Sequence, residues 1–171
     1  AGTYGILFTG LAGTEDELSR TTPLFIRIMG LKLAFINFTY GTNQGSEKGW
    51  PKTNYTGENQ KLEVAFAKCR EAKADYIIVV PHWGTEYQLK HSSNQEKTAQ
   101  MLIKSGADAI IGSHPHVIQD YQEIDGIPVA YSLGNAVSNM SAANTQLELM
   151  ATIQIVRDWN GNTYMLPITF T

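Results

Sequence analysis

Two short apolar segments, each closely followed by histidine, constrain the fold of this chain most strongly. Tyr76–Val80 lies just before one histidine, and Ala109–Ile111 lies just before a His-Pro-His motif. A helical segment separates them, and a strand–helix–strand unit normally forms a right-handed parallel crossover. Both strands then end at one edge of a sheet, outside which ligands bind in open α/β sheets. The sequence therefore predicts that His82, His114 and His116 face one crevice.

Three converging imidazoles favour a metal site, because neutral imidazole is a good ligand for Zn, Fe or Mn. Residues two apart in an extended segment project to the same side. Pro115 disfavours helical backbone at His114, so we expect the His114–His116 pair to be extended and to point into the crevice. A histidine considered alone more often forms an ordinary hydrogen bond in a polar loop. The convergence of three is what indicates a ligand set.

Several residues close to these histidines in the sequence are candidates for supporting roles. Glu86 and Gln119 could each orient an imidazole ring, although a solvated loop position is the commoner role for both. Trp83 could line a pocket, but an aromatic residue beside a strand end more often packs in the core. Asn135 follows a glycine after a strand, where a turn role is favoured over a site role. His91 lies in a polar loop and is expected to be exposed.

The crevice lacks carboxylates that the sequence can place there. A hydrolytic two-metal centre uses carboxylates to hold and bridge its ions. None of the six aspartates lies in a loop that the crossover brings to the crevice, and the chain has no Asp-x-His, Gly-Asp or Asn-His sequence. Taken alone, the histidines are also compatible with a single zinc held by three imidazoles and a water.

The hydropathy pattern predicts a single α/β domain over residues 1–171. We expect a hairpin from strands at 24–29 and 32–38, and an amphipathic helix over 62–72. Ser93 and Glu96 have capping-box spacing, which predicts that a helix begins at Ser93. Further strands are expected at 127–132, 146–156 and 163–170.

Composition limits the possible functions. The chain has 171 residues, is 43% hydrophobic and 17% charged, and carries a formal net charge of −3. It has no basic stripe, which argues against a nucleic-acid partner, and no apolar run near the roughly 20 residues of a membrane span. Its lone cysteine excludes an internal disulfide. The chain begins with Ala1 rather than methionine, which is typical of an expression product, a processed product or a fragment of a longer protein.

Three motifs taken in order resemble a known family. Residues Tyr76 to Tyr87 contain His-Trp-Gly-Thr-Glu-Tyr, Gly106 to Gln119 contain Gly-Ser-His-Pro-His-Val-Ile-Gln, and Tyr131 to Asn135 read Tyr-Ser-Leu-Gly-Asn. Together they resemble bacterial capsule-synthesis proteins of the CapA type (PGA_cap). That family is associated with poly-γ-glutamate capsules and is similar in fold to calcineurin-like metallophosphoesterases. One departure is Ala136, where the family usually has phenylalanine.

The resemblance implies the C-terminal half of a four-layer αββα metallophosphatase sandwich. His82 and His114 resemble the ligands of one metal and His116 a ligand of the other, so the cofactor would be a divalent ion (Mn, Zn or Fe), dinuclear in the intact protein. The family's Gly-Asp and Asn-His motifs would lie upstream of Ala1. With half of the site, the chain is expected to be catalytically inert and to have no catalytic residue of its own.

The resemblance also implies partners and a location. The expected partners are an anionic capsular polymer or the membrane subunits of a capsule synthase, with a homodimer or domain swap through the exposed half-domain face as a further possibility. The full-length protein would be extracytoplasmic, anchored to the membrane or at the cell surface. Two functions stay open at this point. One is a metal-dependent hydrolase, and the other is a non-catalytic polymer-binding or scaffold subunit.

Overall fold

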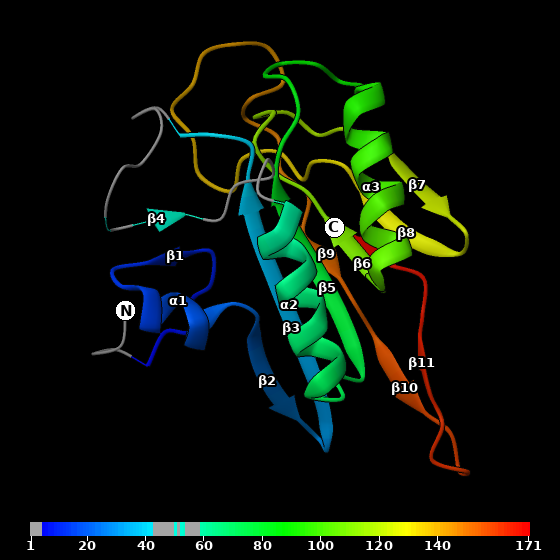
Figure 1. Ribbon diagram of the computed structural model, residues 1–171. Helices are drawn as coiled ribbons and strands as arrows, with labels where there is room; N and C mark the ends of the chain where they lie inside the picture. Colours follow the sequence, from blue (N-terminus) through cyan, green and yellow to red (C-terminus); the bar gives the residue numbers. More distant parts are fainter. Residues whose placement is uncertain (1–4, 43–49, 51, 54–58) are drawn as a thin grey trace.

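One six-stranded sheet organises the protein in the computed structural model, which describes residues 5–42, 50, 52–53 and 59–171 (Figure 1). The strand order is β2-β3-β5-β6-β8-β7. The four inner strands are parallel to one another, and each of the two edge strands is antiparallel to its inner neighbour. The strands are β2 (Leu24–Ile28), β3 (Leu31–Thr39), β5 (Tyr76–His82), β6 (Ala109–Ile111), β8 (Ile127–Ala130) and β7 (Tyr121–Ile124).

Both helices that connect the parallel strands cover the same face of the sheet (Figure 1). Helix α2 (Asn59–Glu71) joins β3 to β5, and α3 (Ser93–Ser105) joins β5 to β6. The strand–helix–strand unit predicted from the sequence is therefore present, with β5 and β6 parallel. Their polar carboxyl ends lie at one edge of the sheet, as the sequence predicted.

The core lies between this helix layer and the sheet. Every second residue of β3, namely Ala34, Ile36 and Phe38, is fully buried, whereas the residues between them are half-buried. This alternation arises because successive side chains of a strand point to opposite faces, and only one face is under the helices. From the helices, Phe66 and Leu102 complete the packing.

Helix α3 begins at Ser93, as the sequence predicted, but its cap lies one residue earlier than the expected capping box. The N-cap is Ser92, whose hydroxyl accepts a hydrogen bond from the backbone N–H of Gln95, and the Gln95 side chain bonds back to the Ser92 backbone. The expected capping pair of Ser93 and Glu96 is wrong, because glutamine serves in the box as well as glutamate does. The C-terminal glycine is as predicted, with Gly106 at φ 111°.

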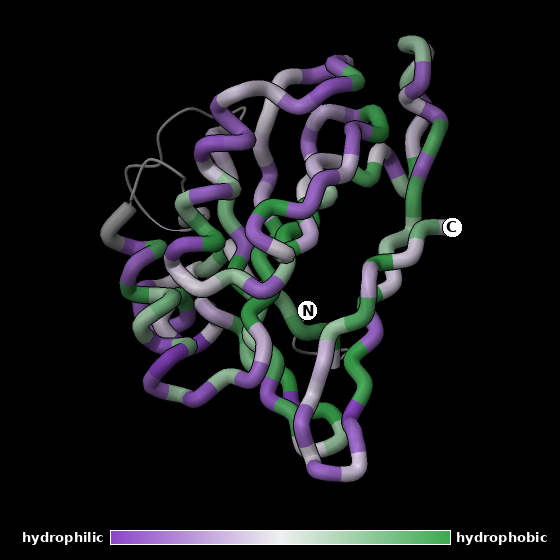
Figure 2. The backbone as a smooth tube through the Cα atoms, turned by 90° about the vertical axis from the view of Figure 1, so that its right-hand side faces the viewer, coloured by the Kyte–Doolittle hydropathy of each residue, from purple (hydrophilic) through white to green (hydrophobic). Residues whose placement is uncertain are grey.

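The remaining elements are short. Strand β1 (Leu11–Ala12) pairs with β4 (Lys52–Thr53), and α1 (Glu15–Thr21) follows β1. The predicted closing strands are present but broken into two antiparallel pairs on the side of the sheet opposite to the helices (Figures 1 and 2). The pairs are β9 (Ala151–Thr152) with β12 (Thr169–Phe170), and β10 (Ile155–Arg157) with β11 (Thr163–Met165). In the described ranges, no helix has the length and apolar character that crossing a membrane requires.

Candidate metal centre at the strand ends

The three predicted histidines converge at the carboxyl edge of the sheet. Strand β5 ends at His82, which forms a parallel bridge to Ser113 just after β6. The ring centroids of His82 and His114 are 4.6 Å apart, and those of His114 and His116 are 5.9 Å apart. The crossover argument therefore places all three imidazoles in one cluster.

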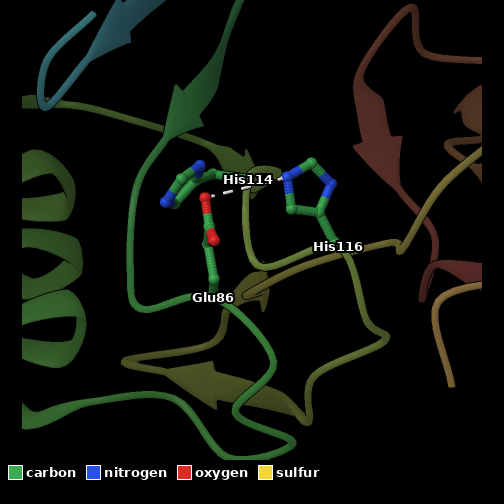
Figure 3. Close-up of side chains that lie close together, drawn as sticks. All are labelled: Glu86, His114 and His116. Carbon is green, nitrogen blue, oxygen red and sulfur yellow. Dashed lines mark ion pairs between the residues drawn. The ribbon is translucent and has the colours of Figure 1, made fainter. Parts of the chain in front are cut away.

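A carboxylate joins this cluster. One ligand atom from each of Glu86, His114 and His116 lies within 4.8 Å of the others (Figure 3). The Glu86 Oε1 is 4.0 Å from His116 Nε2. His82 is not a member of this group but packs against the ring of His114. The described residues thus bring two imidazoles and one carboxylate within the reach of a single ion.

Glu86 lies in an exposed loop, as the sequence favoured, and its carboxylate is close to the histidines. The loop after β5 lies against the His-Pro-His motif, and two backbone hydrogen bonds hold it in this position. The N–H of Trp83 donates to the carbonyl of Ser113 at 3.0 Å, and the N–H of Tyr87 donates to the carbonyl of Pro115 at 2.8 Å. This loop supplies the carboxylate that no aspartate could provide, and periodicity gave no signal for it.

The backbone of the His-Pro-His motif is not extended, contrary to expectation. His114 has φ 109° and His116 has φ 61°, and Tyr87 on the facing loop has φ 63°. Positive φ is uncommon for residues other than glycine, and such strained positions cluster at functional sites. Proline excluded the helical region at His114, as argued, but a turn rather than a strand brings the two rings together.

Asn135 forms hydrogen bonds to the cluster, contacts that a turn role alone would not require. Its Nδ2 donates to the carbonyls of His116 (3.2 Å) and Thr145 (3.0 Å), which leaves Oδ1 facing His116 Nδ1 at 3.0 Å. An oxygen acceptor at Nδ1 fixes the proton there, so the lone pair of neutral His116 lies on Nε2. The turn itself is made by Gly134, whose φ is 81°.

The other candidates lie behind the cluster. Trp83 is buried in the core and donates from Nε1 to the carbonyl of Tyr131 at 2.9 Å, so its predicted packing role is confirmed. Gln119 is buried rather than solvated. His91 is not exposed as expected, because its ring stacks on Tyr131 at 3.9 Å and its Nδ1 lies 2.8 Å from an Asp120 carboxylate oxygen.

Tyr40 is a site residue that the sequence analysis did not identify. Its ring lies 4.6 Å from that of His114 and is stacked on His82 at 6.2 Å, yet the residue is 56% exposed. Tyr40 follows β3, which is parallel to β5. The strand-end argument applied to β5 and β6 would have placed it at the same edge.

A comparison with protein-family models identifies the family of this chain. The model of the family "Bacterial capsule synthesis protein PGA_cap" matches residues 2–140, a span that includes all members of the cluster.

The chain belongs to the PGA_cap family.

Two curated relatives support this membership. The chain is 29% identical over 145 residues to the PGA biosynthesis protein CapA of Bacillus subtilis, covering 83% of this chain and 37% of that protein. It is 39% identical over 77 residues to the capsule biosynthesis protein CapA of Bacillus anthracis, covering 45% of this chain and 19% of that protein. The chain therefore matches well under half of the length of either relative.

Solved structures confirm the predicted fold class of this PGA_cap chain, a calcineurin-like mixed α/β fold. A Staphylococcus aureus protein named "Putative 5'-Nucleotidase" superimposes with a TM-score of 0.62 at 13% identity, covering 96% of this chain and 32% of that one. A hypothetical protein from Thermus thermophilus gives a TM-score of 0.50 at 16% identity, and the match covers 88% of this chain and 60% of that one. At these identities the likeness concerns the fold alone.

Burial favours the neutral form of two imidazoles in the PGA_cap cluster, those of His82 and His114. Burial lowers the pKa of His82 below its usual 6.5, and nearby His116 lowers it further. Burial likewise lowers the pKa of His114, and the other two histidines outweigh the opposing effect of Glu86. A neutral imidazole has a free lone pair, so both rings are in the form that binds metals at neutral pH.

Acid should destabilise this PGA_cap chain through the same two histidines. The unfolded chain takes up protons near pH 6.5, whereas the folded chain does so only at lower pH. Stability is therefore present above about pH 6.5 and decreases as the pH falls toward the lower folded-state values. Urea midpoints at about pH 7.5 and 5.5, followed by circular dichroism, measure this loss. In His114→Asn the loss should be smaller, and an equal loss would contradict the assignment.

Proposed function

We propose that this chain holds a divalent metal ion for a capsule-biosynthesis protein that works outside the cytoplasm. The observation that supports it is the group of ligand atoms from Glu86, His114 and His116 within 4.8 Å of one another. Membership of a capsule synthesis family supports the cell-envelope role.

The donor set fits such an ion. Imidazole suits Zn, Fe and Mn, and a carboxylate adds the negative charge that three histidines alone would lack. Asn135 fixes His116 with its Nε2 lone pair free, on the side where Glu86 lies. Ligating histidines usually have such a partner on their other nitrogen. A bound divalent ion would supply Lewis-acid polarisation of a phosphoryl or carbonyl oxygen.

Turnover should require more of the protein than this chain. The three histidines resemble the ligands of two metals. In this structure Glu86, His114 and His116 form one group of ligand atoms, and His82 lies outside that group, with its ring stacked on Tyr40. The matched relatives are much longer than the chain. We propose that the remaining ligands of a second ion lie in other parts of such proteins, and that this chain alone has no phosphoesterase activity.

We propose three kinds of partner for this chain, and the first is an anionic capsular polymer. The Bacillus subtilis relative is named for PGA biosynthesis. A polymer rich in carboxylates would find no strong attraction in a chain of net charge −3, but a bound divalent cation would attract it locally. Capsule synthase subunits are the second proposed partner. A second copy of the chain is a third, because Ile28 and Met29 are exposed at the end of edge strand β2.

Metal titration of the purified chain tests the proposal. Calorimetry should detect binding of both Mn²⁺ and Zn²⁺. Residues that merely support a metal site typically contribute about 10–100-fold to affinity, so Glu86→Gln, which changes a ligand, should weaken binding by at least that much. The matched control is Glu71→Gln, which changes an exposed glutamate of α2 and should bind as the parent does.

Two results would contradict the proposal. A chain that takes up no stoichiometric metal would favour the scaffold function, since a scaffold needs no ion. Metal binding that is equal in Glu86→Gln and the parent would place the ion elsewhere.

A further inference from the structure

We propose that Gln119 and Gln95 are positioning residues, which hold the loop over residues 83–92 so that Glu86 faces His116. This inference rests on the proposed metal site and goes beyond it, because the hydrogen bonds of both amides go to the loop and to each other rather than to the cluster. Both are buried, at 6% and 1% exposed respectively. Buried amides that form hydrogen bonds to a loop beside a site constrain where that loop lies.

The two amides form a continuous chain of hydrogen bonds. Gln95 Nε2 donates to Gln119 Oε1 at 2.8 Å. Gln119 Nε2 in turn donates to the backbone carbonyls of Gln88 (2.9 Å) and Lys90 (3.2 Å). Those two carbonyls lie on the loop that carries Glu86. Gln119 thus ties that loop to the segment that follows the His-Pro-His motif.

At the other end of this series of hydrogen bonds, the Gln95 side chain holds the residue that caps α3. Gln95 Oε1 accepts hydrogen bonds from the N–H and the hydroxyl of Ser92, at 2.9 and 3.1 Å. The loop also lies directly on this amide at Gly84, where an added Cβ would be 2.7 Å from Gln95 Nε2. Gly84 has φ 96°, so glycine is required there for both space and conformation. One buried side chain thus contacts both ends of the loop.

The centre of this loop is not buried in the core. Residues 85–90 are all exposed, including Glu86 itself. Three hydrogen bonds attach the backbone of that stretch to the rest of the described structure: one from Tyr87 N–H to Pro115, and two from Gln119 to the carbonyls of Gln88 and Lys90. The Tyr87 ring also stacks on His116, with centroids 6.1 Å apart. Removing the Gln119 amide deletes two of these attachments within four residues of Glu86. The place of the carboxylate in the cluster therefore depends on a residue whose amide bonds to the backbone of the loop.

A double-mutant cycle tests this dependence. The protein is titrated with Mn²⁺ or Zn²⁺ as the parent, Gln119→Met, Glu86→Gln and the double variant. Methionine is similar in size to glutamine but donates no hydrogen bond. We expect Gln119→Met to weaken metal binding about 10-fold or more and to have little further effect once Glu86 is glutamine. Gln100→Met, at an exposed position of α3, is the matched control and should bind as the parent does.

Hydrogen exchange without metal separates this inference from the proposed function. In Gln119→Met the Tyr87 amide should exchange faster, while the amides of α3 should not change. Gln119→Asn keeps an amide that is too short to reach both carbonyls, and serves if the methionine variant does not fold. Parent protein that binds no metal would overturn the proposed function. Unchanged exchange at Tyr87 would overturn the loop-holding role, and equal losses of affinity in both Glu86 backgrounds would overturn its action through Glu86.

Discussion

Replacing Gly112 with alanine is expected to destabilise the protein by about 3 kcal/mol or more, at the upper end of the cost of overpacking. Gly112 follows β6 and leads into the His-Pro-His motif. A Cβ there would lie 2.2 Å from the carbonyl oxygen of Tyr131 and 2.4 Å from Nε1 of Trp83. Neither group can easily retreat, because the two are hydrogen-bonded to each other at 2.9 Å.

The backbone of Gly112 cannot move away either. Its N–H donates to the carbonyl of Ala130 at 2.7 Å, and its own carbonyl accepts from Leu133 at 3.3 Å. Urea unfolding followed by circular dichroism measures the loss. Gly41→Ala is the matched control, since an added Cβ at Gly41 meets nothing within 4 Å. A Gly112→Ala variant as stable as Gly41→Ala would show that the strand ends are less rigid than the hydrogen bonds indicate.

Gly112 also illustrates what the sequence could and could not reveal about the fold. The parallel arrangement of β5 and β6 followed from two apolar runs separated by a helix, since topology rules leave few alternatives. The close approach of β6, Trp83 and Tyr131 did not, because it depends on a contact between residues far apart in the chain. The same holds for hairpin β7–β8, where only a strand over 127–132 was expected, because the exposed edge strand β7 has no clear alternation in hydropathy.

The candidate site divides in the same way. Histidines placed directly at strand ends could be assigned to one edge, and Tyr40 would have followed from the same rule. Glu86 and Asn135 could not, because each reaches the cluster through a loop. The positions of such loops are set by hydrogen bonds, for example from Tyr87 N–H to Pro115 and from Asn135 to His116, which leave no periodic pattern in the sequence.

Replacing Trp83 should lower the stability of the protein without weakening metal binding. Trp83 is 4% exposed in the core, and its indole N–H satisfies the Tyr131 carbonyl. Trp83→Ala removes a large buried ring and is expected to cost about 3–5 kcal/mol. Trp83→Phe keeps most of the ring but leaves the carbonyl without its donor, for an expected cost of about 1–3 kcal/mol. Urea midpoints measure both, with Trp159→Phe as the control at a 96% exposed tryptophan.

Metal titration of Trp83→Phe completes this test. The backbone N–H of residue 83 still donates to the Ser113 carbonyl, and Gln119 still holds the loop, so Glu86 should keep its place. We therefore expect lower stability with metal affinity within about threefold of the parent, since neither a ligand nor an orienting hydrogen bond is lost. A loss as large as that in Glu86→Gln would mean that the indole positions the ligands. An unchanged midpoint would mean that the hydrogen bond to Tyr131 is not formed in solution. These variants therefore test whether the core beneath the strand ends determines stability while the loop above them determines metal affinity.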